Sequence, residues 1–126
     1  CVLVRKDHTF AKKEHVHIKQ LQEVEIITYN KNNTLYNKFV EMCQEQGFVP
    51  DIIYQSMMPN FVMDVISYGN CVGIVPAPML EQFPNEELVS IPIRPHFPWE
   101  IAMITKKERY LPNAANSFLE FVQEHL

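Results

Sequence analysis

Polar side chains follow two expected strand ends, and their types suit hydrogen bonding to a small ligand. In chain order they are Thr28, Asn30, Asn33, Thr34, Gln55 and Ser56. In an open parallel sheet, the carboxyl ends of the strands and the amino ends of the following helices share one edge. Unpaired backbone N–H groups and helix dipoles make such an edge attractive to anions. The pattern predicts a pocket for a small polar or carboxylate ligand, although ordinary helix capping uses the same residue types.

Groups for covalent or phosphate chemistry are few. The three glycines, Gly47, Gly69 and Gly73, are too dispersed to build a phosphate-binding loop, and no Gly-x-Ser-x-Gly motif occurs. Cys43 falls on an apolar helical face and Cys71 opens an apolar run, and buried cysteines of this kind are usually inert. The sequence therefore predicts no catalytic residue, and the protein is not expected to be an enzyme.

Two histidines are the nearest approach to a metal motif. His15 and His17 are separated by one residue, so an extended backbone would direct both imidazoles the same way. A zinc site needs further ligands, and none stands nearby at a recognisable spacing. We interpret this segment as a solvated polar loop and predict neither a metal site nor a cofactor.

Hydrophobic patterns predict the elements that would position these residues. Runs of β-branched and aromatic residues indicate strands at 2–4, 24–29, 51–54, 71–76, 88–93 and 99–105. Helical spacing indicates helices from about residue 35 to 46, over 56–68 and over 113–126, with single turns near 18–22 and 78–83. Asn33 or Thr34 would cap the first helix, and Gly47 suits the position just past its end. This alternation predicts an α/β fold with a largely parallel sheet, in which Pro92 restricts the strand at 88–93 to an edge or a crossing segment.

The composition restricts the function further. The chain has 126 residues, of which 47% are hydrophobic, and this suits one globular domain. A net charge of -4 disfavours contact with phosphate backbones, so the chain itself is not expected to bind DNA. No apolar run approaches the roughly 18 residues of a membrane span, so no membrane partner is expected. Three cysteines and no recognisable leader favour a reducing compartment, which predicts a cytoplasmic protein.

Several motifs resemble the effector-binding domain of LysR-type transcriptional regulators. Residues 8–11, His-Thr-Phe-Ala, are similar to the family's His-Pro-Leu-Ala, with Thr9 in place of the proline. Residues 47–50 resemble its Gly-Phe-x-Pro, and residues 65–76 resemble its glycine-containing apolar block that ends in Leu-Pro. Residues 111–121 are similar to the start of its last helix. The order and spacing of these motifs extend along essentially the whole chain.

The resemblance implies a periplasmic-binding-protein-like (type 2) fold, in which two α/β subdomains are joined by crossing strands. Residues 1–13 would then end the first subdomain and make the first crossing, and residues 14–92 would form the second subdomain nearly complete. Residues 93–126 would return to the first subdomain as a strand and the C-terminal helix. The remainder of the first subdomain and a winged-helix domain would lie outside this chain, so we expect a truncated regulator.

The resemblance also implies a function. Such a bacterial regulator senses a small metabolite, here expected to be a carboxylate, in the cleft between its subdomains. The cleft residues would be Thr28, Tyr29, Asn30, Asn33, Thr34, Gln55, Ser56 and Pro76. The protein would be a homo-oligomer, a dimer or a tetramer, that binds DNA only through the winged-helix domain. The alternative is a transporter's solute-binding protein, or an enzyme lobe, on the same two-lobed fold.

Overall fold

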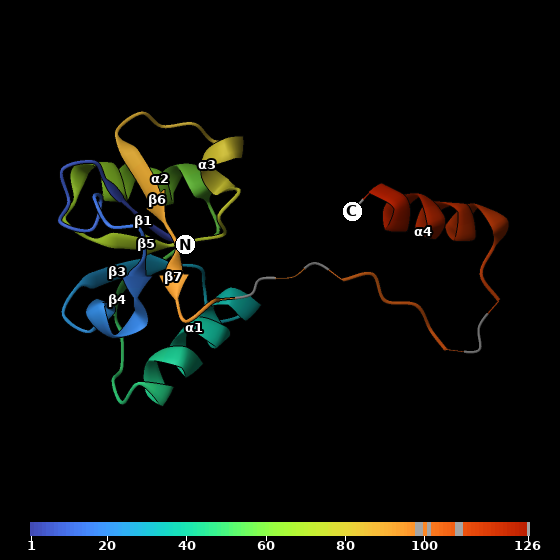
Figure 1. The fold of residues 1–126 in the computed structure, drawn as a ribbon, viewed down its shortest axis with the longest axis horizontal. Helices are drawn as coiled ribbons and strands as arrows, with labels where there is room; N and C mark the ends of the chain where they lie inside the picture. Colours follow the sequence, from blue (N-terminus) through green and yellow to red (C-terminus); the bar gives the residue numbers. More distant parts are fainter. Residues whose placement is uncertain (98–99, 101, 108–109, 126) are drawn as a thin grey trace.

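Strands and helices alternate along the chain in a computed structural model that describes residues 1–97, 100, 102–107 and 110–125. Figure 1 shows a sheet with helices on both of its faces, followed by an extended segment and a last helix. The strands are β1 (Val2–Arg5), β2 (Val16–His17), β3 (Glu25–Thr28), β4 (Asp51–Gln55), β5 (Val72–Ile74), β6 (Leu88–Ile91) and β7 (Ile93–Arg94). The helices are the 3-10 turn η1 (Ile18–Leu21) and the α-helices α1 (Thr34–Glu45), α2 (Pro59–Tyr68), α3 (Met79–Gln82) and α4 (Asn113–His125).

Five strands form the main sheet in the order β4-β3-β5-β1-β6. β3 pairs in parallel with β4 and β5, whereas β1 runs antiparallel to both β5 and β6. The sheet is therefore mixed, which corrects the expectation of a largely parallel one. Sequence periodicity does not report strand direction, and a single reversed strand makes two of the four pairings antiparallel.

β1 lies between β5 and β6 in this sheet, and its apolar residues are fully buried. Val2 and Val4 contribute to the core on one face of the sheet, and Leu3 contributes to the core on the other face. Three consecutive apolar residues are typical of a strand covered on both faces. Residues 2–5 therefore share one sheet with strands from the segment 14–92.

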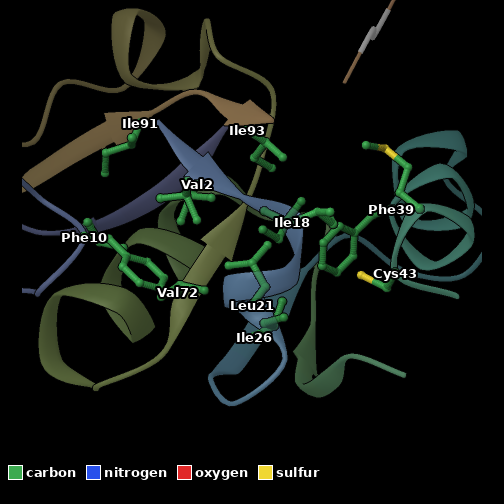
Figure 2. Packing of buried hydrophobic residues seen from close by; sticks show 14 of the residues in the cluster. Val2, Phe10, Ile18, Leu21, Ile26, Phe39, Cys43, Val72, Ile91 and Ile93 are labelled. Atoms are coloured by element: carbon green, nitrogen blue, oxygen red, sulfur yellow. The ribbon is translucent and has the colours of Figure 1, made fainter. Parts of the chain in front are cut away.

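One face of the sheet packs against α1 and η1. Figure 2 shows Phe39 and Cys43 of α1 directed toward Ile18 and Leu21 of η1 and toward Ile26 of β3. The i, i+4 and i+8 spacing of Leu35, Phe39 and Cys43 places these side chains on the helix face that the sheet covers. The predicted helix is confirmed, and Gly47 follows it with a φ of 83°, a left-handed conformation that glycine adopts without strain.

The opposite face packs against α2 and α3. Val62, Met63 and Ile66 of α2 form this second core with Leu3 and Ile27, which point away from the first core. β5 has a glycine here because α2 approaches very closely. A Cβ atom on Gly73 would lie 2.5 Å from Cδ1 of Ile66 and 3.3 Å from Cβ of Leu3.

α2 begins three residues later than the predicted start at Ser56. The Ser56 hydroxyl oxygen accepts a hydrogen bond from the backbone N–H of Met58, which forms a local turn instead of a helical one. Pro59 is then the first residue of the helix, a position that needs no N–H donor. Within this helix Met63 is buried, whereas Phe61 is exposed.

The strand expected at 88–93 is divided by Pro92. β6 is an edge strand of the main sheet, and β7 leaves it to pair in parallel with β2. Proline lacks the N–H that a continuous ladder would need, so the predicted edge or crossing segment is confirmed. In the second pairing, Val16 lies opposite Ile93 and His17 lies opposite Arg94.

The chain after β7 forms no further strand among the described residues. Glu100 and residues 102–105 have no regular structure, and Ile104 is 92% exposed, so the predicted strand at 99–105 is wrong for these positions. Trp99 and Ile101 of that prediction lie outside the described residues. A segment forms a strand only when its backbone pairs with a neighbouring strand, and a β-like composition does not guarantee such a neighbour. α4 is confirmed as a helix, but none of its residues is buried, and Figure 1 shows it apart from the sheet.

Candidate functional site

The predicted site residues lie where β3, β4 and β5 end. In the register of the sheet, Thr28 pairs with Gln55 on one side and with Ile74 on the other. The backbone N–H of Ser56 donates to the carbonyl of Thr28 at 3.0 Å, which holds the two strand ends together. The structure therefore brings Thr28, Gln55 and Ser56 to one edge of the sheet.

The β3–α1 loop carries the next group of predicted residues. Asn33 caps α1, because its side-chain oxygen accepts a hydrogen bond from the Leu35 N–H at 2.8 Å. The Asn33 side-chain amide donates to the Met57 sulfur at 3.9 Å, so this loop also contacts the β4–α2 loop. Asn30 shapes the loop, since its side-chain oxygen accepts from the Asn32 N–H at 3.3 Å. Capping and turn formation thus account for part of the polar side chains in this loop.

Thr34 and Tyr29 differ in their exposure. Thr34 is the first residue of α1 and its side chain is exposed to solvent. Tyr29 is half-buried and packs against the core beside α1, and burial raises the pKa of its phenol above the ordinary value. The phenol is therefore a neutral group that can donate a hydrogen bond at neutral pH.

Pro76 follows the end of β5 and begins the turn into α3. Its carbonyl accepts a hydrogen bond from the Met79 N–H at 3.1 Å. β5 ends at Ile74 beside Thr28, so Pro76 is placed at the same end of the sheet as the other predicted residues. Its position relative to the other predicted residues follows from the pairing of β5 with β3.

Met57 also belongs to this edge, although no sequence pattern predicted it. Met57 is 50% exposed and lies between the end of β4 and the start of α2. The sequence contains one signal for this position. Met57 is an apolar residue that directly follows Gln55 and Ser56 in a loop between a strand and a helix. Neighbouring Met58 is 67% exposed and is the residue before the helix.

Cys43, Cys71 and His17 have structural roles. Cys43 and Cys71 are buried, and desolvation raises the pKa of both thiols, that of Cys43 to about 12. Such thiols remain protonated at neutral pH and are poor nucleophiles. His17 caps η1, since its ring nitrogen Nδ1 accepts from the Lys19 N–H at 3.3 Å, and its backbone N–H donates to the side-chain oxygen of Gln20 at 2.9 Å.

A cavity of about 520 Å³ lies at the other end of the sheet. Its lining includes Arg5, Ser67 and Asn85, at the end of β1, near the end of α2 and before β6. Because β1 runs opposite to β5, the end of β1 is remote from the ends of β3, β4 and β5. This cavity is therefore separate from the candidate site.

Among the described residues, no helix has the length and hydropathy that crossing a bilayer requires.

Comparison with known proteins supports the fold and the domain type. The sequence model of the LysR substrate binding domain matches residues 1–126. YwbI of Bacillus subtilis, described as an uncharacterized HTH-type transcriptional regulator, is 28% identical over 126 residues, which cover 99% of this chain and 42% of that protein. The chain thus spans about two fifths of the length of the curated relatives that it matches.

Two solved structures with bound ligands have a similar fold. The CcmR regulatory domain of Synechocystis PCC6803, in complex with 2-PG, gives a TM-score of 0.80 at 14% identity and covers 98% of this chain and 61% of that one. The effector binding domain of QuiR, in complex with shikimate, gives 0.73 at 16% identity and covers 98% and 59%. At such low identities, these structural similarities show only the shared mixed α/β, periplasmic-binding-protein-like fold.

Proposed function

Since this chain belongs to the LysR substrate-binding domain family, we propose that it provides one wall of an inducer site in a bacterial transcriptional regulator. The observation that carries this proposal is the convergence of three strand ends and the loops into α1 and α2 at one edge of the sheet. The inducer is a small carboxylate that binds at this edge. The regulator binds and does not catalyse, and its compartment is the cytoplasm.

The edge offers groups that suit a carboxylate. The first turn of a helix has N–H groups without helical partners, and the helix dipole favours negative charge there. The exposed Thr34 hydroxyl lies in the first turn of α1, and Ser56 can donate its hydroxyl proton while its oxygen accepts from Met58. Tyr29, Asn30, Asn33, Gln55 and Pro76 complete the set that we propose for the site. Ligand complexes of two proteins with this fold, with 2-PG and with shikimate, support the general idea of a small-molecule site.

The opposite wall of the site belongs to a first subdomain. Residues 14–92 form most of the second subdomain, and residues 93–126 return to the first, where α4 packs on residues outside this chain. The exposure of Phe118 and Phe121 on α4 supports this assignment, since a helix with such an apolar surface needs a partner. The short β2–β7 pairing then marks the crossing between the two subdomains.

Inducer binding controls transcription through a change in subdomain angle. The ligand closes the cleft, and the closed arrangement is transmitted through a homo-oligomer, a dimer or a tetramer, to winged-helix domains that contact DNA. Only a ligand with different affinities for the two arrangements shifts their populations. The acidic chain described here does not contact DNA itself.

Thermal unfolding of the full-length regulator with a panel of small carboxylates tests the proposal. A ligand that binds the folded state stabilises it, by about 2.7 kcal/mol at a concentration 100 times its Kd, so at least one carboxylate should raise the Tm. The same compounds as amides, which lack the negative charge, should give smaller shifts. A panel of broad chemistry in which no carboxylate changes the Tm would contradict the proposal.

A further inference from the structure

The candidate site has an apolar component in addition to its hydrogen-bonding groups. Met57 is 50% exposed and Met58 is 67% exposed in the loop that joins β4 to α2. Soluble proteins expose single apolar residues routinely, but this loop exposes two adjacent methionines within a polar strand-end cluster. Methionine is flexible and polarizable, so it adapts to the shape of an apolar ligand group.

The Met57 side chain contacts the opposite loop. The Asn33 amide donates to the Met57 sulfur at 3.9 Å, and Asn33 also caps α1. The Met57 side chain therefore extends from the β4–α2 loop toward the first turn of α1, where the proposed carboxylate binds. A ligand held at that turn would have this side chain beside it.

The wall of the site that this chain provides carries little charge. The segments 28–34, 55–59 and 75–78 contain one basic residue, Lys31, and no acidic residue. A ligand with several negative charges needs several cationic partners to offset its desolvation. Neutral hydrogen-bond donors, one lysine and an apolar side chain suit a ligand with one carboxylate and an apolar body.

We infer that the inducer is a monocarboxylate whose apolar part packs against Met57. This inference rests on the proposed function, because it names the ligand class of the same site. The carboxylate lies at the first turn of α1, and the hydrocarbon part extends over the β4–α2 loop. Met57 is thus a specificity-determining residue, which selects apolar acids over polar ones.

Binding of an acid series to the full-length regulator tests the inference. The probes are acetate, butyrate and hexanoate, with benzoate as an aromatic acid and malate as a polar one, and Kd is measured by calorimetry. Each methylene that becomes buried should tighten binding about fourfold, so hexanoate should bind far better than acetate. Malate should bind more weakly than hexanoate.

Variants locate this dependence on chain length. Met57→Gln keeps the length of the side chain but makes it polar, and it should flatten the gradient from acetate to hexanoate, whereas Met57→Leu should retain it. Val49→Thr is the matched control, because Val49 is 78% exposed before the start of β4, at the other end of that strand. The control should leave the gradient unchanged.

The outcomes separate this inference from the proposed function. If malate or another polar acid binds while the acetate-to-hexanoate series shows no gradient, the inference is wrong and the inducer site stands. A gradient that Met57→Gln leaves intact also overturns the inference. If none of these acids binds but a polar carboxylate of the broad panel does, the inference is wrong. If no carboxylate of that panel changes the Tm, the proposed function itself is contradicted.

Discussion

The Thr28 hydroxyl donates a hydrogen bond to the backbone carbonyl of Ile74 at 2.9 Å, and Thr28 is fully buried. This bond joins the end of β3 to the end of β5. A threonine hydroxyl has one proton to donate, so that proton is already engaged inside the protein. Thr28 therefore holds the end of β3 against the end of β5 at the edge of the candidate site.

Replacement of Thr28 by valine tests this positioning role. Valine has nearly the same shape but no hydroxyl, so the carbonyl of Ile74 loses a buried partner, and the free energy of unfolding should fall by about 1–3 kcal/mol. Thr28→Ser should lose less, because it retains the hydroxyl. Thr105→Val, at an exposed position, is the matched control and should change stability by less than about 0.5 kcal/mol. Chemical denaturation measures all three, and equal effects of the two valine variants would contradict the role.

Asn33 should stabilise the protein as the cap of α1. Asn33→Ala removes the side-chain oxygen that accepts from the Leu35 N–H, and this should cost about 1 kcal/mol. Asn33→Ser should restore part of the loss, because serine is also a good capping residue. Asn32→Ala is the control on the same loop, where the side chain is exposed. If Asn32→Ala lowers the midpoint of denaturation as much as Asn33→Ala does, the cap is not the cause.

Gly73 should be required because Ile66 occupies the space of its missing side chain. The Cβ of Gly73→Ala would lie 2.5 Å from Cδ1 of Ile66, so the variant should lose about 1–3 kcal/mol through overpacking. Ile66→Val removes that Cδ1 atom. The double variant should therefore be more stable than the sum of the two single losses predicts, with a coupling of about 0.5–3 kcal/mol.

Gly47→Ala provides the contrast to the Gly73 cycle. Gly47 has a φ of 83°, and a Cβ added to it would meet no atom within 4 Å, so its substitution should cost about 1–2 kcal/mol through backbone strain alone. Ile66→Val should give no rescue in combination with Gly47→Ala. Purely additive losses in both double variants would show that the close approach of α2 to β5 does not explain the glycine.

The elements of this fold that were predicted correctly are those with a local signal. α1 has helical spacing, a capping asparagine and a glycine just past its end, and its boundaries match the prediction closely. The division at Pro92 has an equally local cause. The direction of β1 depends on pairing with β5 and β6, and the start of α2 depends on how Ser56 bonds to its own loop. Neither of these has a signature in the spacing of apolar residues.

The candidate site was predictable to a similar extent. Strand ends followed by helix starts predicted that Thr34 and Ser56 share one edge. The Ser56 N–H donates to the carbonyl of Thr28 at the end of β3, and Thr34 begins α1, the helix that follows β3. The side-chain bond from Thr28 to Ile74 joins residues that are 46 positions apart. The contact between Asn33 and Met57 likewise links two loops. Such contacts arise from the tertiary arrangement, so the sequence alone did not identify them.

Burial of Cys43 should make stability fall at alkaline pH. Desolvation raises the pKa of this thiol from 9.0 to about 12, so the folded protein holds the proton more tightly than the unfolded chain does. The resulting stabilisation is fully present below about pH 9 and is lost as the pH rises toward about 12.

Denaturation of the protein and of Cys43→Ala at pH 8 and pH 10 measures this effect. The stability difference between the two proteins should become smaller at pH 10, because only the parent protein has this thiol to ionise.

Iodoacetamide at pH 8 should alkylate Cys43 only after unfolding, whereas the half-buried Cys1 should react earlier. Rapid alkylation of Cys43 in the folded protein would contradict the assigned burial.

Thr34 and Ser56 should contribute directly to inducer affinity. Thr34 is exposed in the first turn of α1, so Thr34→Ala removes a donor to the bound carboxylate with little effect on packing. A hydrogen bond to a charged group contributes about 1.5–3 kcal/mol, so Kd should rise roughly tenfold to a hundredfold. Ser56→Ala should weaken binding similarly but should also lower the Tm of the free protein, because the Met58 N–H loses its partner.

Phe39→Leu, a change in the buried face of α1, separates affinity from stability: it should lower the Tm and leave Kd nearly unchanged. If Phe39→Leu weakens binding as much as Thr34→Ala does, the loss of affinity reflects destabilisation, and the hydroxyl has no direct role.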